Sequence, residues 1–441
     1  MTFRSVQLDA WVCLASTVGC SANNLLTRLT VTPSPHERYA DALRAAPLAG
    51  TAMAQDWLRA ADAALAQPLA VALPLRESAY FPSDQALATA YRFELTRGRR
   101  LEIQVTFDSV ATTQLFVDLF EETAAEPPER VASLAEGNTL TYDVRRDGIF
   151  LLRVQPELLR GGRYEIIQRT LASLMFPVSG LTARAVQSEF GAARDAGRRE
   201  HEGIDIFAPR NTPVVAVIEG TAAPGTNQLG GNVVWLRDRR TPRSFYYAHL
   251  TRSAFEDTTA VQAGDVVGYV GNTGNARTTA PHLHFGIYER GAIDPLPFLQ
   301  ADDAVPAANT RGADTLGELV RTNLARTPLA PAISRSTPAH TELERGSVMR
   351  VLGISGGRLR VMLPKHSTGY VDESAVTLAR AALRQRRLVA GNIVRDQPLV
   401  RAPIVHTVEQ PVTVDVLGQF GGFDLIRTAP GPLGWVEQTL R

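Results

Sequence analysis

The spacing of apolar residues changes along this chain of 441 residues, which indicates several separate domains. In residues 35–67 apolar side chains recur at the spacing of an amphipathic helix, and Pro47 and Gly50 divide this region into two pieces. From about residue 73 to residue 170 the period becomes two, in short runs separated by turn residues. We therefore expect a helical segment at 21–72 and an antiparallel β-sandwich at 73–172.

The C-terminal part contains an internal repeat with an offset of 65 residues (351 to 416). Val351-Leu-Gly-Ile-Ser-Gly-Gly357 recurs as Val416-Leu-Gly-Gln-Phe-Gly-Gly422. A repeat of this length with short alternating strands predicts two small β modules. We place these modules at 326–378 and 388–441, after a polar linker at 301–325.

Both kinds of β region resemble modules of bacterial wall enzymes. The sandwich resembles the pre-peptidase C-terminal type found beside secreted bacterial peptidases. The repeated modules, which end in Gly369-Tyr370-Val371 and Gly434-Trp435-Val436, are similar to bacterial SH3 domains, small β-barrels that often bind peptidoglycan. Tyr370 and Trp435 either line a ligand groove or belong to the core, since aromatic side chains supply burial in both cases.

Residues 1–20 have the pattern of an export signal, with a basic start, an apolar stretch and a small residue before Cys20. Thr17-Val-Gly-Cys20 resembles a bacterial lipobox, although Asp9 interrupts the apolar stretch and Thr17 replaces the usual leucine. The resemblance implies a lipoprotein of the cell envelope, anchored at Cys20 and facing the periplasm. The alternative is a buried N-terminal strand or helix. No later stretch reaches the ~20 apolar residues of a transmembrane helix, so we expect none in the mature chain.

Charge and cysteine content narrow the possible functions. The chain has 46 basic and 45 acidic residues and a net charge of +1, so nothing favours a nucleic-acid partner. Its two cysteines, Cys13 and Cys20, both lie near the start, which leaves no later pair for a disulfide or a cysteine-based zinc site.

Four of the eight histidines lie between residues 201 and 284 and carry the candidate chemistry. In His201-Glu-Gly-Ile-Asp205 the apolar residues favour a strand, on which His201 and Asp205 share one face. The central glycine leaves room between the two polar groups. In His282-Leu-His284 a strand again projects both imidazoles from one face. His249 lies between these two motifs.

This set of side chains suits a catalytic zinc ion. Zinc in enzymes typically takes three histidine or carboxylate ligands and leaves one position for water, whose pKa falls to about 7. Catalysis also needs a base for the proton of that water and a donor for the oxyanion. His249 and the remaining histidine of the last motif fit these tasks. Spacing alone does not decide whether His282 or His284 binds the metal.

The same motifs resemble those of the LytM/lysostaphin-type zinc endopeptidases, peptidase family M23. The resemblance covers about residues 173–300 and implies a compact antiparallel β domain with a groove over the metal. Ala280 stands where the family commonly has glycine. Three separated motifs occur in the family's order: His201-x-x-x-Asp205, Tyr247-Ala-His249-Leu250 and His282-Leu-His284-Phe285.

The resemblance also assigns the roles that spacing leaves open. It implies one Zn²⁺ per chain, held by His201, Asp205 and His284. It gives the transfer of the proton to His282 and the stabilisation of the tetrahedral intermediate to His249.

These features predict a mainly β, multidomain zinc metalloendopeptidase that hydrolyses peptide cross-links of bacterial peptidoglycan. The family implies the D-Ala–diaminopimelate bond in a thin wall of the diaminopimelate type, with a glycine bridge as the other candidate. Two alternatives are a non-catalytic regulator of wall amidases and a wall-binding lipoprotein with an incidental metal site. The regulators lack ligand residues, whereas this chain has all of them.

Overall fold

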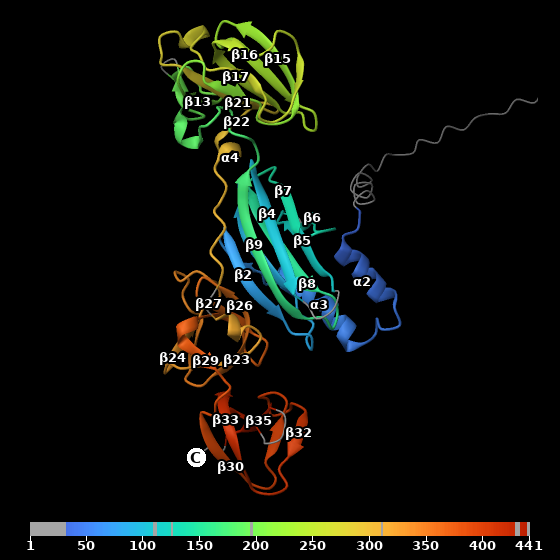
Figure 1. Cartoon of the computed structure of the whole chain (residues 1–441). Coiled ribbons are helices and arrows are strands. Elements are labelled where there is room, and N and C mark those ends of the chain that lie inside the picture. The colour runs from blue at the N-terminus through green and yellow to red at the C-terminus, as the bar shows by residue number, and fades with distance from the viewer. Residues whose placement is uncertain are drawn as a thin grey trace, which may run out of the picture.

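The computed structural model describes residues 32–108, 113–124, 127–194, 197–309, 312–427 and 433–438. This part of the chain is mainly β and forms several units, as predicted (Figure 1). The export signal and lipobox expected at 1–20, with Cys20, lie outside the described residues. No helix within the described ranges has the length and apolar character to cross a membrane.

Two helices, α2 (Pro35–Ala45) and α3 (Ala52–Ala66), form the N-terminal helical segment beside the sandwich (Figure 1). The Ser34 hydroxyl accepts a hydrogen bond from the backbone N–H of Glu37, and the Glu37 carboxylate accepts one from Ser34, which makes a capping box. Trp57 of α3 is buried, and its indole N–H donates to a carbonyl oxygen of the sandwich. The helices are therefore tied to the sheet through this side chain.

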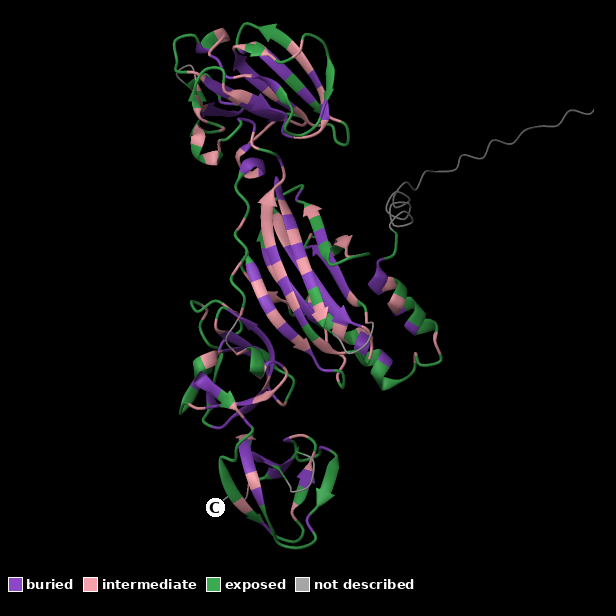
Figure 2. Cartoon of the chain, in the orientation of Figure 1, coloured by how far each residue is buried: buried purple, intermediate pink, exposed green. Residues whose placement is uncertain are grey.

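Two sheets with a shared apolar core form the sandwich. Buried and less buried residues alternate along its strands, as Figure 2 shows, because one face of each sheet turns to the core. One sheet has the order β1 (Leu69–Ala70), β3 (Thr89–Leu95), β8 (Gly148–Pro156), β5 (Leu115–Glu121) and β6 (Glu129–Ser133). The other contains β2 (Leu75–Phe81), β9 (Gly162–Ala172), β4 (Arg99–Asp108) and β7 (Thr139–Asp143).

The next unit is built on an antiparallel sheet with its own apolar core. Its order is β10 (Val186–Ser188), β13 (Ile204–Phe207), β21 (His282–Tyr288), β17 (Ser244–Leu250), β16 (Gly231–Asp238), β15 (Gly220–Asn227) and β19 (Thr259–Val261), with β22 (Ala292–Ile293) paired to β21. A second sheet contains β14 (Pro213–Val215), β20 (Val266–Tyr269) and β18 (Arg252–Ser253). The hairpin of β11 (Ala193–Arg194) and β12 (Arg199–Glu200) and the helix α4 (Leu296–Leu299) complete it.

Two small β modules follow. The first contains β23 (Leu319–Thr322), β26 (Val348–Ser355), β27 (Arg358–Met362), β28 (Thr368–Asp372), β29 (Val376–Leu378) and the pair β24 (Arg326–Leu329) and β25 (Thr341–Glu344). The second contains β30 (Arg384–Leu388), β33 (Val412–Phe420), β34 (Phe423–Arg427), β35 (Leu433–Glu437), β31 (Ile393–Arg395) and β32 (Ile404–Thr407).

Two of the expected boundaries are wrong. The linker predicted at 301–325 ends too late, because β23 lies inside that range and pairs with β26 and β29 of the first module. The second module begins before residue 388, because β30 pairs with β33 over its whole length. Both strands are short and contain polar residues, so the pattern of apolar residues does not reveal them.

The 65-residue repeat forms equivalent hairpins, β26–β27 and β33–β34. Gly356 and Gly357 have φ of +56° and +76°, and Gly421 and Gly422 have φ of +56° and +83°. Two successive residues in this left-handed region require glycine in practice. The repeated Gly-Gly pair therefore specifies the same tight turn twice.

The aromatic residues of the repeat belong to the core. Tyr370 is 1% exposed and Trp435 is 7% exposed, so neither ring is available to a ligand. Of the two readings, core packing is the correct one. The likeness of the modules to SH3 domains stays a prediction.

The sandwich contacts its neighbours at both ends. Phe298 of α4 packs against Gly98, where a Cβ atom would lie 2.6 Å from the ring. At the other end β2 pairs with β26, so the sandwich sheet continues into the first module. Across that junction Arg360 of β27 donates to Glu77 of β2 at 2.9 Å, and both side chains are buried.

Candidate metal centre

Two neighbouring strands position most of the candidate residues. In the antiparallel pairing of β13 with β21, Asp205 stands opposite His284. Side chains alternate between the two faces of a strand, so the polar residues project to one side and their apolar neighbours to the other. Those neighbours are completely buried in the domain core: Ile204, Ile206, Leu283 and Phe285.

His201 reaches the same place from outside the strand. β13 begins only at Ile204, after a bend, so the expectation that His201 shares a strand face with Asp205 is wrong. Gly203 in this bend lies against the ring of His284, and a Cβ atom there would be 2.8 Å from the ring. The glycine therefore leaves room for the imidazole of His284, whereas the sequence suggested only that it leaves room between His201 and Asp205.

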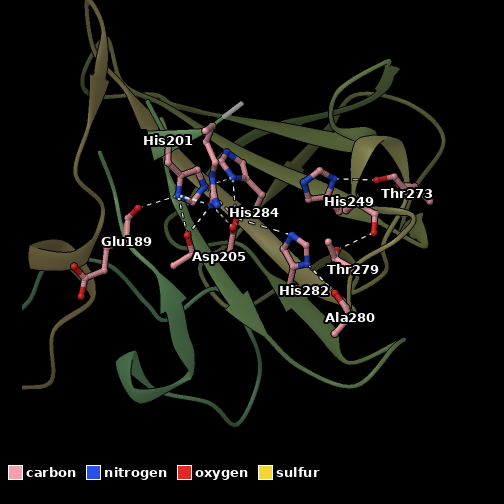
Figure 3. A network of polar contacts seen from close by, with 12 residues as sticks. Glu189, His201, Asp205, His249, Thr273, Thr279, Ala280, His282 and His284 are labelled. Carbon is pink, nitrogen blue, oxygen red and sulfur yellow. Dashed lines mark hydrogen bonds and ion pairs between the residues drawn. The ribbon is translucent and has the colours of Figure 1, made fainter. Parts of the chain in front are cut away.

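Three ligand atoms converge at this point, as Figure 3 shows. Nε2 of His201 lies 2.9 Å from Nδ1 of His284 and 3.1 Å from Oδ1 of Asp205. Nδ1 of His284 lies 3.1 Å from the same oxygen. Two ligands of a tetrahedral zinc ion, each about 2.1 Å from it, are about 3.4 Å apart. The observed triangle is close to that size.

One tautomer of His201 prepares this triangle for a metal ion. Its Nδ1 lies 2.9 Å from the carbonyl oxygen of Glu189, and when Nδ1–H donates to that oxygen, Nε2 presents a lone pair. In this tautomer Nε2 of His201 and Oδ1 of Asp205, 3.1 Å apart, are both acceptors, and a bound cation would remove their repulsion. The residues therefore fit a small divalent metal ion.

The electrostatics of the centre favour the forms that bind a metal. Burial works to raise the pKa of Asp205, but the close imidazole nitrogens of His201 and His284 outweigh it and hold this pKa below its ordinary value. Burial also lowers the pKa of His284 and so favours the neutral ring. A charged carboxylate and a neutral imidazole are the states in which these residues ligate.

Two further imidazoles lie beside the triangle, each fixed by a backbone oxygen (Figure 3). Nδ1–H of His282 donates to the carbonyl of Ala280 and Nδ1–H of His249 to that of Thr273, both at 2.9 Å. In each neutral ring Nε2 is then an acceptor. Nε2 of His282 lies 4.0 Å from Oδ1 of Asp205.

His249 is held in a strained conformation near the end of β17. Its φ is +63°, a region that residues other than glycine rarely adopt and that is often found at functional sites. Burial first, and then the neighbouring rings of His282 and His284, lower the pKa of His249 from 6.5 to about 4. The ring is therefore neutral in the free protein.

A groove of about 1150 Å³ contains the centre and the two flanking histidines. Beyond His284 its floor carries three aromatic side chains from adjacent strands. The ring of Tyr246 lies 5.9 Å from that of His284, and the ring of Trp235 lies 4.5 Å from Tyr246 and 5.4 Å from Tyr288. The groove therefore continues from the metal centre over an aromatic surface.

Residues 199–295 match the sequence model of peptidase family M23. The chain carries an M23 peptidase domain. The match lies inside the range 173–300 that the motifs indicated and includes all five candidate residues.

Curated relatives of the M23 domain are endopeptidases by name. An L-Ala--D-Glu endopeptidase of Bacillus subtilis is 36% identical over 140 residues, 29% of this chain and 43% of the relative. The glycyl-glycine endopeptidase ALE-1 of Staphylococcus capitis is 31% identical over 164 residues, 34% of this chain and 45% of the relative. A DD-carboxypeptidase/endopeptidase Mpg of Neisseria meningitidis is 38% identical over 128 residues, 27% of this chain and 29% of the relative. Each match thus spans less than half of the relative.

Among solved structures, the catalytic domain of the antimicrobial peptidase lysostaphin from Staphylococcus simulans is similar to the M23 domain. It is 30% identical, covers 26% of this chain and 94% of its own, and gives a TM-score of 0.24.

The structure thus brings together every site residue proposed from the sequence of the M23 domain. Two groups of residues were missed. Arg194 contacts Asp205 at 2.7 Å, but nothing in its local sequence places it there. The aromatic trio had a usable signal, since the period of two puts Tyr288 and Tyr246 on the strand face of His284.

Proposed function

We propose that the M23 domain is a zinc-dependent endopeptidase that hydrolyses peptide cross-links of bacterial peptidoglycan. The supporting observation is the convergence of three lone-pair donors in an open groove, with two more imidazoles beside them. The names of the relatives, which are endopeptidases for several different peptide bonds, agree with this class of reaction.

His201, Asp205 and His284 would hold one Zn²⁺ through Nε2, Oδ1 and Nδ1 respectively. When bound, zinc supplies a Lewis acid for the scissile carbonyl and acidifies water in the site. The protein fixes the ligands beforehand: the Glu189 carbonyl orients His201, and the bend at Gly203 makes room for the ring of His284.

We assign proton transfer to His282. Its Nδ1–H is committed to the Ala280 carbonyl, so Nε2 is free to accept a proton from the attacking water and pass it to the leaving amine. The ring is buried and stacks against Phe207 at 4.9 Å, which limits its rotation. This side chain therefore has the tautomer and the rigidity that a general base needs.

We assign stabilisation of the tetrahedral intermediate to His249. Its Nδ1–H is already committed to Thr273, so Nε2 would donate to the developing oxyanion after the ring takes up a second proton from solvent in the groove. Its ring lies 5.0 Å from that of His282, near enough to act on the same substrate group. Both imidazoles then serve one reacting carbonyl from one wall of the groove.

We further propose that the protein acts at the cell envelope, exported and anchored through a lipid on Cys20. The SH3-like modules at the C-terminus would hold the M23 domain near the wall, because linked binding raises the local concentration of substrate. The D-Ala–diaminopimelate cross-link is the proposed bond in a thin wall of the diaminopimelate type.

The test uses the purified full chain loaded with zinc and incubated with isolated sacculi of that wall type. We expect cross-linked muropeptides to disappear and uncross-linked ones to accumulate, with the activity lost on adding a chelator and restored by zinc. His282→Ala should be inactive, whereas His340→Ala, which replaces an exposed histidine of the first module, should behave like wild type.

Two outcomes would contradict the proposal. Zinc-loaded protein that binds sacculi and releases nothing would favour the wall-binding alternative. Stimulation of an added wall amidase by His282→Ala and wild type alike would favour the regulator.

A further inference from the structure

The two carboxylate oxygens of Asp205 have different surroundings. Oδ1 faces the ligand nitrogens of His201 and His284 at 3.1 Å each. Oδ2 accepts a hydrogen bond at 2.7 Å from Nη2 of Arg194, which lies on the hairpin β11–β12. One oxygen is therefore directed at the metal position, and the other is held by a cation.

Arg194 is itself held in place. Its Nη2 also donates to the hydroxyl of Ser188 at 2.6 Å. The hairpin that carries it is tied to the metal centre through the backbone, because the N–H of His201 donates to the Ala192 carbonyl and the His201 carbonyl accepts from Gly191. The Arg194 side chain is 31% exposed and that of Asp205 is 12% exposed, so water screens this ion pair only in part.

We propose that Arg194 is a positioning residue of the metal centre, which makes Asp205 bind through one oxygen only. A carboxylate free to rotate can coordinate with both oxygens and so take the position that water needs. A charge-assisted hydrogen bond to Oδ2 removes that option. The guanidinium also cancels the charge of Asp205, so two neutral histidines and this pair have no net formal charge. The positive charge of a bound divalent ion is then not reduced by its surroundings.

The competing explanation is that Arg194 only fastens the hairpin to the domain. Nη2 also lies 3.0 Å from Nδ1 of His201 and donates to it in the tautomer in which Nδ1 carries no proton. The polar partners of Nη2 are therefore Asp205 and Ser188, and in that tautomer also His201. A purely mechanical role would alter the stability of the hairpin and leave metal coordination unchanged.

The role of Arg194 rests on the proposed metal, and its test does not depend on peptidase activity. Full-length wild type, Arg194→Gln and Arg194→Lys are titrated with Zn²⁺ in competition with a coloured chelator. We expect Arg194→Gln to raise the Kd for zinc about 10- to 100-fold, the usual effect of losing a partner of a ligand, and the lysine variant to recover part of it. Arg184→Gln, which removes an exposed arginine of the same domain, should leave the Kd unchanged.

The visible spectrum of the Co²⁺-loaded proteins gives a second measurement. Absorption weakens as the coordination number rises, so Arg194→Gln should have weaker bands than wild type when both Asp205 oxygens bind. An unchanged zinc Kd together with an unchanged spectrum in Arg194→Gln would overturn the proposed role. In that event, wild type that still binds zinc and cleaves sacculi would leave the peptidase proposal standing. Wild type that binds no zinc would overturn both.

Discussion

Two buried polar clusters in this molecule have opposite designs. At the junction of the sandwich and the first module, Glu77 and Arg360 are 2% and 4% exposed, and they pair at 2.9 Å. The hydroxyl of Tyr91 donates to the second oxygen of Glu77, and that of Tyr164 lies 3.4 Å from Arg360. In the M23 domain the centre instead brings three potential metal ligands to about 3 Å from one another.

The difference separates a structural cluster from a binding site. Burying a charge is costly unless it is paired and hydrogen-bonded, and the junction meets that condition within the protein. The metal centre meets it only in part, because three potential ligand atoms face one another there and a bound cation would satisfy all three. Convergent ligand atoms on a rigid sheet therefore indicate a cation site more directly than any single residue does.

The largest effect should come from Asp205→Ala. It removes one of three ligands, so zinc affinity and release of muropeptides should both fall by more than about 100-fold, the upper range for losing only a ligand's partner. Metal content after dialysis and muropeptide analysis measure this. The metal-free variant should unfold at nearly the same denaturant concentration as metal-free wild type, since the ion pair with Arg194 that it loses is partly exposed and contributes about 1 kcal/mol or less. A large loss of stability without metal would contradict the contrast between the two clusters.

Breaking the ion pair at the junction should have the opposite effects: a loss of stability and no loss of zinc. Glu77→Leu leaves Arg360 buried without its anion, so we expect a loss of roughly 3–5 kcal/mol in the free energy of unfolding and no change in zinc content. Denaturant titration of the full chain measures the first and metal analysis the second. The double variant Glu77→Leu/Arg360→Met should recover most of the loss, because no unpaired charge remains. A double variant as unstable as the single one would show that the pair matters for another reason.

These two clusters also mark the limit of prediction from the sequence. The period of two predicted the β regions, and the short motifs around His201, Asp205 and the pair His282 and His284 predicted a metal site, because both signals are local. The choice of His284 over His282 as a ligand came from the family resemblance. The pairing of Glu77 with Arg360 joins residues 283 positions apart, and nothing local encodes it. The bend before β13 was missed for a related reason. From the sequence, Gly203 looks like one more residue of a strand. In the structure it lies in a bend, where a larger side chain would collide with the ring of His284.

A smaller effect on the free energy of unfolding is expected from pH at a third polar cluster. Its side chains, like those of the junction, are paired within the protein. His36 of α2 contacts Gln155 at 2.7 Å and accepts at Nδ1 from Arg153 at 2.9 Å, while Arg153 pairs with Asp118. Burial first, and then the charge of Arg153, lower the pKa of His36 from 6.5 to about 4, against the pull of Asp118 and Glu37.

The sign of this pH dependence follows from the protons bound. Between pH 6.5 and pH 4 the unfolded chain protonates His36 and the folded chain does not, so stability falls as pH falls through this window. The expected loss is up to about 3 kcal/mol, and it is absent above pH 6.5. Denaturant titrations of wild type and His36→Gln at pH 7 and pH 4.5 test it. Equal pH dependence in both proteins would contradict the assignment to His36.

The smallest effect is expected from the exposed aromatic residues of the groove, in contrast to the buried aromatic residues of the junction. Trp235 is 36% exposed and packs on Tyr246 in the groove, whereas Tyr91 of the junction is completely buried. If the groove binds the peptidoglycan stem over these rings, Trp235→Leu should raise KM by about 2- to 10-fold, equivalent to the ~0.5–1.5 kcal/mol of an aromatic contact, and leave kcat nearly unchanged. Steady-state hydrolysis of a soluble cross-linked muropeptide measures both.

Val266→Ala, a change at a similarly exposed apolar residue outside the groove lining, is the matched control. A fall in kcat with constant KM would instead assign Trp235 to the reacting centre, because binding common to substrate and transition state changes KM alone.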